Sequence, residues 1–251
     1  MRQRFTPDDE LHLLIRSLAI DYAAGGSEEG HAHAWPQFLY ARSGAIRVEI
    51  GSKWWTIPPR RGLWIPAGVR HRLFMSSRLQ LRTLYFSPAF AGERNDVGAV
   101  DVSGLLHEAI LRVCERGSLD ARRVADRNLA EVILNEVKRS NPSMIALTMP
   151  VDPRARRLAE LFLNSDQLSA SMDLLCERAG LSRRTAERLF LNEAGLPPAQ
   201  WRRFSALMES VVNIAGGERI DNAAFSAGYQ SRSAFSEAFV RAFGIPPSAA
   251  R

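Results

Sequence analysis

A chain of 251 residues is long enough for two modest domains, and its formal net charge of +6 permits a polyanionic partner without proving one. Two cysteines, Cys114 and Cys176, lie in separate helical patterns without metal-type spacing, which excludes a disulfide framework and favours a reducing compartment. The chain shows neither a signal-peptide core nor an apolar run of membrane-spanning length, so we expect a cytoplasmic protein with no membrane partner.

Residues 38 to 86 carry the pattern of several short strands. Ile46, Val48 and Ile50 alternate with polar residues, which predicts a strand with one apolar face. Glycine-containing pairs at 43–44 and 51–52 mark turns on either side of it. Apolar runs at 63–65, 73–75 and 79–86 predict further strands. So many short strands at this spacing indicate a sandwich or a barrel.

Three histidines accompany these strands. His31 and His33 are two residues apart, so in a strand they share a face. A turn at residues 66–68 could bring His71 back to meet them. Three imidazoles and the amide oxygen of Gln37 could hold a divalent transition metal, which makes His31, His33, Gln37 and His71 a candidate metal set. The alternative is that these histidines only line or support a pocket.

The order His-x-His-x-x-x-Gln, then Trp-Ile-Pro-Ala-Gly and His71, resembles the two sequence motifs of the cupin barrel. The resemblance spans about residues 26 to 90, and Gln37 stands where a cupin usually has glutamate. It implies a cupin-like effector domain, which we place in residues 1–100. Loss of the carboxylate removes a negative charge that would favour a cation, so the resemblance leaves the metal open.

Four of the five tryptophans also fall in this half of the chain, and only Trp201 lies outside it. Tryptophan offers a broad apolar surface and a hydrogen-bond donor, which suits a flat or aromatic ligand. The alternative for any single tryptophan is that it fills the barrel core. We predict an effector site that contains Trp35, Gln37, Trp54, Trp64 and His71.

Residues 101–150 are predicted to form a helical linker. Two amphipathic stripes are visible, and Asn141-Pro142 ends the second helix. Each stripe must be buried, either on the barrel or on a second subunit, and we expect dimerisation here. Residues 141–153, with three prolines, are expected to be a connection without regular structure. The stripes are Leu106, Ala109, Ile110 and Val113, then Leu129, Val132, Ile133 and Val137.

Residues 151–251 contain an internal repeat with an offset of 49 residues. In each copy a small helix-like stretch and a glycine precede a second helix that opens with Ser-Arg, which is the layout of a helix-turn-helix DNA reader. A repeat of this length indicates one structural unit used twice. Ser182-Arg183 recurs as Ser231-Arg232, Phe190 as Phe239, and Gly195, Pro197 and Pro198 as Gly244, Pro246 and Pro247.

Each predicted reading helix has an apolar face for its own domain and a polar face for DNA. We expect Ala186, Leu189 and Phe190 to point inward in the first copy, and Phe235, Phe239 and Val240 in the second. The stretch 201–214 predicts a long helix that holds the two readers about 34–36 Å apart on one face of DNA. The alternative is a helical bundle with solvated arginines. The predicted DNA contacts are Ser182, Arg183, Arg184, Glu187, Arg188, Ser231, Arg232, Ser233, Ser236 and Glu237.

The chain closes on a pattern made of Gly228-Tyr229, Phe235, Phe239, Gly244, Pro247 and Arg251. With this pattern the C-terminal region resembles the AraC/XylS family of bacterial transcription regulators. The resemblance covers roughly residues 154 to 251. It implies base-edge roles for Arg184, Glu187 and Arg188, and for Arg232, Ser233 and Glu237. The site of Glu237 is usually arginine and that of Ala250 usually aromatic, so we expect the second reader to add less affinity or to read another base.

Together these patterns predict an α+β chain: a cupin-like β-barrel, linking helices and an all-α domain with two helix-turn-helix motifs. The predicted function is a DNA-binding transcriptional regulator controlled by a small-molecule effector, not an enzyme, with double-stranded DNA and a second copy of the chain as partners. One alternative is a metal-dependent cupin enzyme tethered to DNA, which Gln37 and the double reader make less favoured. Another is a DNA-binding protein whose barrel responds to nothing. The order around the histidines also resembles regulators that control exporters of small toxic compounds.

Overall fold

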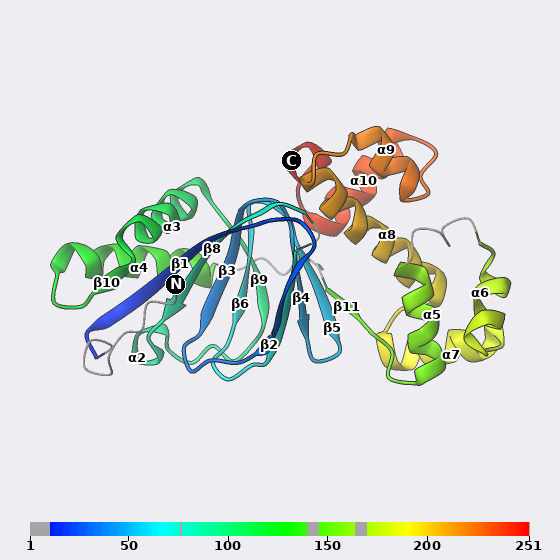
Figure 1. Cartoon of the computed structure of the whole chain (residues 1–251), viewed down its shortest axis with the longest axis horizontal. Coiled ribbons are helices and arrows are strands. Elements are labelled where there is room, and N and C mark those ends of the chain that lie inside the picture. The colour runs from blue at the N-terminus through cyan, green and yellow to red at the C-terminus, as the bar shows by residue number, and fades with distance from the viewer. Residues whose placement is uncertain (1–10, 76, 140–145, 164–169, 251) are drawn as a thin grey trace.

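The computed structural model describes residues 11–75, 77–139, 146–163 and 170–250 (Figure 1). Two antiparallel sheets form the N-terminal half. The first has the strand order β10-β1-β8-β3-β6-β9 and the second β11-β5-β4-β7-β2. The strands are β1 (Leu13–Tyr22), β2 (Gly26–His31), β3 (Gln37–Ser43), β4 (Ile46–Ile50), β5 (Lys53–Ile57), β6 (Arg61–Ile65), β7 (His71–Met75), β8 (Leu79–Phe86), β9 (Gly98–Asp101), β10 (Ser118–Asp120) and β11 (Ala146–Thr148).

The space between the sheets is filled by apolar side chains at alternate strand positions. In β4, Ile46 and Val48 are buried while Arg47 and Glu49 are only partly so, as the alternation predicts. Gly44, with a φ of 80°, makes the tight turn before β4, and a side chain there would collide with the backbone of Arg78. The barrel therefore has a packed apolar interior along these strands.

Five strands lie outside the region expected to be β-structure, and one of them is β2, which ends at His31. β1 pairs with β8 from Ile15 to Tyr22, although the sequence reasoning began the strands at residue 38. β9, β10 and β11 also join the sheets from beyond residue 97. β11 pairs with β5 inside the segment expected to be an unstructured connection, so Ala146–Thr148 are part of the barrel. Residues 140–145, which include Pro142, lie outside the described residues.

Helices α3 (Gly104–Arg116) and α4 (Val124–Lys138) cover the outer face of the first sheet. Ser103 caps α3 by accepting a hydrogen bond from the amide of Leu106, and Gly117 ends it with a φ of 85°. The apolar stripes of both helices pack on strand side chains such as Ile15 and Phe86. The two stripes are therefore buried against the barrel of the same chain and not against a second subunit. Val132, in the stripe of α4, is the one stripe residue that is exposed.

The C-terminal half is helical and lies on the opposite side of the barrel from α3 and α4 (Figure 1). α8 is the longest helix of this half, with α5 to α7 at one end and α9, α10 and η2 at the other. The α+β fold class predicted from the sequence is confirmed. The elements are α5 (Pro153–Leu163), α6 (Met172–Ala179), α7 (Arg183–Ala194), α8 (Pro198–Ala215), α9 (Ile220–Ser226), α10 (Arg232–Phe243) and η2 (Pro247–Ala250), with the short α2 (Pro88–Ala91) in the other half.

Among the described residues, the structure contains no helix that is both long enough and apolar enough to cross a bilayer.

Candidate DNA-reading helices and sensor site

The first reader is the pair α6 and α7. Gly180 ends α6 in the left-handed conformation, which turns the chain sharply toward α7. The Ser182 hydroxyl then caps α7 by accepting a hydrogen bond from the amide of Thr185 at 3.2 Å. Phe190, on the inner face of α7, packs edge-on against Trp201 with ring centroids 5.9 Å apart. Ser182, Arg183, Arg184 and Arg188 are exposed and Glu187 is half-buried.

The second reader, α9 and α10, repeats this construction. Ser231 caps α10 through the amide of Ala234 at 3.2 Å, and Gly244 ends it in the left-handed conformation. Phe235 and Phe239 are fully buried, as expected. Val240 is 45% exposed, so its predicted inward position is wrong. Of the predicted DNA contacts here, Ser231, Arg232, Ser233 and Glu237 are exposed and Ser236 is half-buried.

Each reading helix begins with an arginine that pairs with an aspartate of the preceding helix. Arg183 lies 3.5 Å from Asp173, and Arg232 lies 3.7 Å from Asp221. The aspartates are 48 residues apart in sequence but the arginines 49, because the second turn holds one extra residue. Both pairs are exposed, so they add little stability. Their effect is to hold the first guanidinium of each reader beside its own helix-turn-helix.

α8 connects the two readers as one continuous helix of 18 residues, about 27 Å long at 1.5 Å per residue. Trp201, near its start, is fully buried, and its indole N–H donates to the carbonyl of Thr148 on β11 at 2.9 Å. Glu193 on α7 accepts hydrogen bonds from the amides of Val151 and Asp152 at 2.7 and 2.9 Å. The first reader is therefore tied to the strand and connection that leave the barrel.

The second reader is tied directly to the barrel by Arg61. This side chain of β6 is only 3% exposed, pairs with Asp101 of β9, and donates to the carbonyl of Phe243 at 2.6 Å. Phe243 is the last residue of α10, so a cation lies at the negative end of a reading helix. Burial lowers the pKa of Arg61, although guanidinium remains charged. No sequence pattern marked Arg61, because its partner is 182 residues away.

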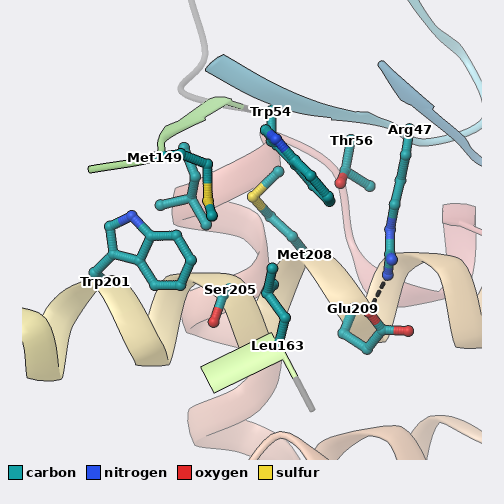
Figure 2. A pocket seen from close by; sticks show the side chains of 10 residues that line it. Arg47, Trp54, Thr56, Met149, Leu163, Trp201, Ser205, Met208 and Glu209 are labelled. Carbon is teal, nitrogen blue, oxygen red and sulfur yellow. Dashed lines mark hydrogen bonds and ion pairs between the residues drawn. The ribbon is translucent and has the colours of Figure 1, made fainter. Parts of the chain in front are cut away.

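A second contact between barrel and reader domain surrounds a small cavity (Figure 2). Arg47 of β4 pairs with Glu209 of α8 at one side of it. Its volume of about 20 Å³ leaves room for roughly one water molecule. Trp54 lines this cavity, and its indole nitrogen is buried without a hydrogen-bond partner. Trp54 thus lies between the domains and not beside the histidines. The lining residues are Arg47, Trp54, Thr56, Leu147, Met149, Leu163, Trp201, Ser205, Met208 and Glu209.

The other proposed effector tryptophans are also separated. Trp64 is buried on the outer face of the first sheet, where it packs against Phe86 under α3 and α4. This placement favours a core role for Trp64. Trp35 is half-buried, and the guanidinium of Arg16 lies 3.9 Å from its ring centroid. Of the three, only Trp35 lies near the histidines, since its carbonyl contacts His33.

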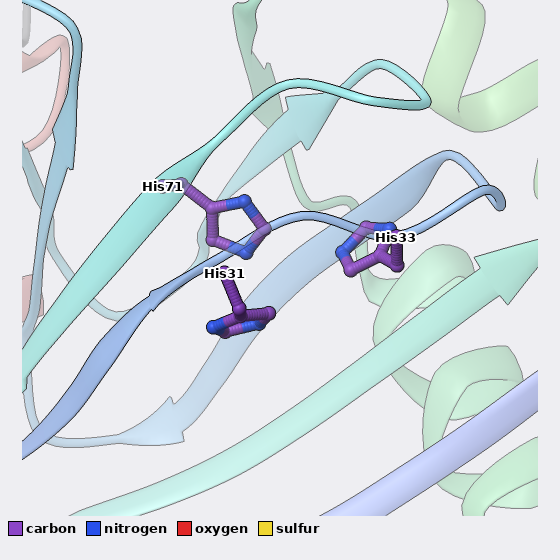
Figure 3. A group of neighbouring side chains, drawn as sticks. All are labelled: His31, His33 and His71. Atoms are coloured by element: carbon purple, nitrogen blue, oxygen red, sulfur yellow. The ribbon is translucent and has the colours of Figure 1, made fainter.

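The structure brings His31, His33 and His71 together (Figure 3). His31 ends β2 and lies opposite His71, the first residue of β7, while His33 follows in the loop toward β3. Each can offer one nitrogen, and these three atoms lie within 4.8 Å of one another. A tetrahedral ion with bonds of about 2.0–2.1 Å needs nitrogens roughly 3.4 Å apart, which small ring rotations would supply.

Backbone carbonyls fix the tautomer of all three imidazoles. The Nδ1 atoms of His31, His33 and His71 lie 3.0, 2.6 and 3.0 Å from the carbonyl oxygens of Glu29, Trp35 and Val69 respectively. A carbonyl can only accept, so each Nδ1 carries the proton and each Nε2 keeps its lone pair when the ring is neutral. A hydrogen bond from the far nitrogen is what normally orients a metal-ligating histidine.

Gln37 completes the cluster with an oriented oxygen. The Thr83 hydroxyl donates to the carbonyl of Phe38, so it must accept from the Gln37 amide nitrogen, which is 2.9 Å away. The amide oxygen of Gln37 then faces His33 Nε2 at 3.0 Å. Two lone pairs meet at this distance when His33 is neutral, and a cation between them relieves the repulsion.

His71 adds a second sign of a cation site. Its Nε2 is buried and has no hydrogen-bond partner. Burial lowers the pKa of His71 to about 4, so the ring stays neutral and able to ligate near pH 7. The donor set of three imidazoles and one amide oxygen fits a divalent ion of the series from Mn to Zn. The sequence reasoning did not identify Thr83 and Tyr85, which hold Gln37, because they are 46 and 48 residues away in sequence.

Comparison with known proteins agrees with both halves of the chain. A family model described as a helix-turn-helix domain matches residues 175–251, and a cupin domain model matches residues 19–86. The chain is similar to the HTH-type transcriptional regulator NimR of Escherichia coli strain K12, with 25% identity over 217 residues, 86% of this chain and 80% of that protein.

Two solved structures also resemble the chain. One is the fatty-acid-bound ToxT of Vibrio cholerae, with 15% identity, a TM-score of 0.39, and coverage of 99% of this chain and 96% of that one. The other is a cupin-2 domain protein of Shewanella frigidimarina, with 14% identity and a TM-score of 0.27, over 29% of this chain and 71% of that one.

Proposed function

We propose that the two readers of this chain bind adjacent major grooves of one operator, under the control of a small molecule sensed by the barrel. The basis is that the chain is an AraC-type helix-turn-helix regulator with an N-terminal cupin domain. The family comprises transcription regulators and not enzymes, which removes the tethered cupin enzyme from consideration. Its place of action would be the cytoplasm, where the chromosome of a bacterium lies.

The observation that carries this proposal is the duplicated geometry of the readers. α7 and α10 each have a serine cap, a left-handed glycine at the end, and a buried aromatic inner face. Their outer faces are exposed and mostly polar, and α8 joins them without a break. A helical bundle that only contacts water does not require two equivalent polar faces joined by one helix. Duplex DNA, in contrast, presents equivalent major grooves one helical turn apart.

The two readers would contribute unequally. Arg184 and Arg188 lie one turn apart on the exposed face of α7 and can reach guanine edges in the major groove. The equivalent face of α10 has Ser233 and Glu237. A carboxylate can accept a hydrogen bond from cytosine N4 but repels phosphates, so the second reader would add selectivity more than affinity.

The barrel would hold a divalent transition metal at His31, His33 and His71, with Gln37 as a fourth ligand. Support comes from the three Nδ1 protons held by carbonyls and from the unpartnered Nε2 of His71. When bound, the metal would supply open coordination positions for an effector with a nitrogen or oxygen donor. Trp35 could stack on an aromatic effector beside this site, because it is half-buried and its carbonyl contacts His33.

The signal would pass to DNA through the contacts of the barrel with the reader domain. Arg61 holds the end of α10, and Arg47 holds α8 through Glu209. An effector that shifts β4 or β6 would change the angle between the readers. A homodimer, which would let four reading helices engage repeated half-sites, would need the outer faces of α3 and α4, where Leu105 and Val124 are exposed.

The test of DNA recognition begins with selection of bound duplexes from a random library by the purified full-length chain. Arg188→Ala should then weaken binding to the selected site by about 1–3 kcal/mol and relax preference at one base pair, while binding to scrambled DNA at the same salt changes little. Leu174→Ala, on the outer face of α6, is the matched control. Equal losses on specific and scrambled DNA would show that Arg188 contacts only phosphate.

The test of the sensor is elemental analysis of the chain purified without added metal. We expect about one divalent ion of the series from Mn to Zn per chain. Each of the single variants His71→Ala and His33→Ala should lose this ion. His107→Ala is the control, because His107 lies away from the cluster and bonds Tyr40 instead. Retention of the ion by the double variant His33→Ala/His71→Ala would exclude this site. A transcription reporter that still responded normally in the double variant would remove the cluster from sensing.

A further inference from the structure

Each reading helix carries one exposed apolar side chain near its end. Leu191 on α7 is 50% exposed and Val240 on α10 is 45% exposed. The two residues are 49 apart in sequence, so they occupy the same position in the two copies of the repeat. A single exposed aliphatic side chain is ordinary on a protein surface, but this one recurs at the same position of both helices. The duplication argues that these positions serve the same purpose in both helices.

Both residues lie on the stripe that faces DNA. Leu191 follows Arg184 by seven residues and Arg188 by three, which places all three on one side of α7. Val240 has the same relation to Ser233 and Glu237. The opposite side of each helix is already filled by buried residues such as Phe190 and Phe239. Neither aliphatic side chain can therefore turn into its own core.

The major groove exposes one apolar group, the C5-methyl of thymine, and small aliphatic side chains recognise it by contact. We propose that Leu191 and Val240 each read a thymine methyl group in the operator, at the far end of the base contacts made by α7 and α10. The inference rests on the proposed insertion of these helices into the major groove. It assigns the second reader, whose polar contacts are weak, an apolar means of discrimination.

A protein partner on these side chains is the competing occupant. The shared stripe favours DNA, because any partner covering Leu191 would also cover Arg188 on the reading face. On α7 and α10 the exposed large apolar residues are Leu191 and Val240, each set among polar neighbours. Such single apolar positions suit a methyl group and are too small for a protein interface.

The test uses uracil, which differs from thymine only by the missing methyl group and keeps every hydrogen-bonding atom. Each thymine of the selected duplex is replaced singly by uracil, and affinity for the full-length chain is measured. Loss of one buried methyl contact should weaken binding about fourfold. We expect this loss at one thymine in each half of the site. Leu191→Ala should show no such loss for uracil at the responsive position of the first half. Val240→Ala should show none for uracil at the responsive position of the second half.

The controls separate this inference from the function on which it rests. Leu174→Ala removes an exposed leucine of α6 that lies off the reading helices, and it should keep the full uracil effect at both positions. The inference is overturned if no thymine responds to uracil in the wild-type chain, or if the response persists unchanged in Leu191→Ala and Val240→Ala. The uracil scan of the wild-type chain changes only the DNA, so its result does not depend on whether a protein variant folds. If selection returns no specific duplex at all, the proposed function itself fails.

Discussion

Single side chains in this protein take their chemical roles from the backbone and side-chain atoms around them. His31, His33 and His71 each have the Nδ1 proton directed to a carbonyl two residues away in sequence, which leaves Nε2 for a ligand. Gln37 is oriented in the same way by Thr83. Arg183 and Arg232 are held by aspartates before any DNA is present. In each case the residue type permits several roles and its neighbours select one.

Glu237 belongs to this scale, because in the proposed complex a single charge would set how α10 meets the phosphates. Glu237→Arg should raise affinity for DNA of any sequence and steepen the dependence of log K on log salt by about one unit, since an added phosphate contact releases counterions. Glu93→Arg, at an exposed position between α2 and β9, is a charge-matched control away from the reading stripe. Titration at several salt concentrations decides the matter, and an unchanged slope would mean that this side chain points away from DNA.

Pairs of elements are joined by few polar contacts between otherwise apolar faces. Aliphatic residues of α3 and the aromatic residues Phe38 and Tyr40 of β3 share one buried cluster. One hydrogen bond joins the two elements: the Tyr40 hydroxyl lies 2.7 Å from His107 Nδ1. Burial raises the pKa of Tyr40, so the phenol is the donor and a neutral His107 the acceptor. Burial also lowers the pKa of His107 below its ordinary value of 6.5.

This hydrogen bond predicts a pH dependence of stability. Because the pKa of His107 is lowered on folding, the unfolded chain takes up a proton first as pH falls below about 6.5, and the folded state loses stability from there until His107 itself is protonated. His107→Gln, which has no such titration, should show a smaller loss of unfolding free energy between pH 7.5 and 5.5. Urea unfolding at the two pH values measures the difference. Parallel losses in both proteins would refute a contribution from His107.

At the scale of the whole molecule, the barrel and the reader domain form one continuous apolar core. The buried cluster runs from barrel residues such as Val48 through Leu147 to Trp201 and Phe243. The sequence reasoning treated residues 154–251 as a separate unit beyond a proline-rich connection. The contacts of Arg61, Arg47 and Glu193 instead tie each reader to the sensor side by polar bonds.

Arg61 offers the sharpest test of this coupling. Arg61→Met keeps much of the buried volume but removes the donor from the Phe243 carbonyl, so we expect a cost of about 1–3 kcal/mol in stability. Amide exchange should speed up along residues 232–243 and stay unchanged along 183–194, because the first reader is held elsewhere. Arg42→Ala, an exposed arginine of β3, is the control. Uniform acceleration in both readers would show general destabilisation and not a local hold on α10.

Local pattern was enough to predict much of this protein. The β-rich first half, the amphipathic helices, the double helix-turn-helix, and the meeting of His31, His33 and His71 were all expected, because each depends on spacing within a strand, a helix or a repeat. The inner aromatic faces of the readers were predicted for the same reason. Val240 was misplaced, because helical spacing alone could not tell an edge of the buried face from the exposed stripe.

Contacts between residues distant in sequence were decided only by the tertiary structure. β10 and β11 are three residues each, too short for a periodic signal, and become strands because β1 and β5 offer free edges to pair with. Trp35 lies in the loop beside the histidines, Trp54 lies between the domains, and Trp64 lies under α3. The residue type is the same in all three, and only the folded position of each separates their roles. Arg61 reaches α10 only because folding brings β6 to it, and no local pattern records that approach.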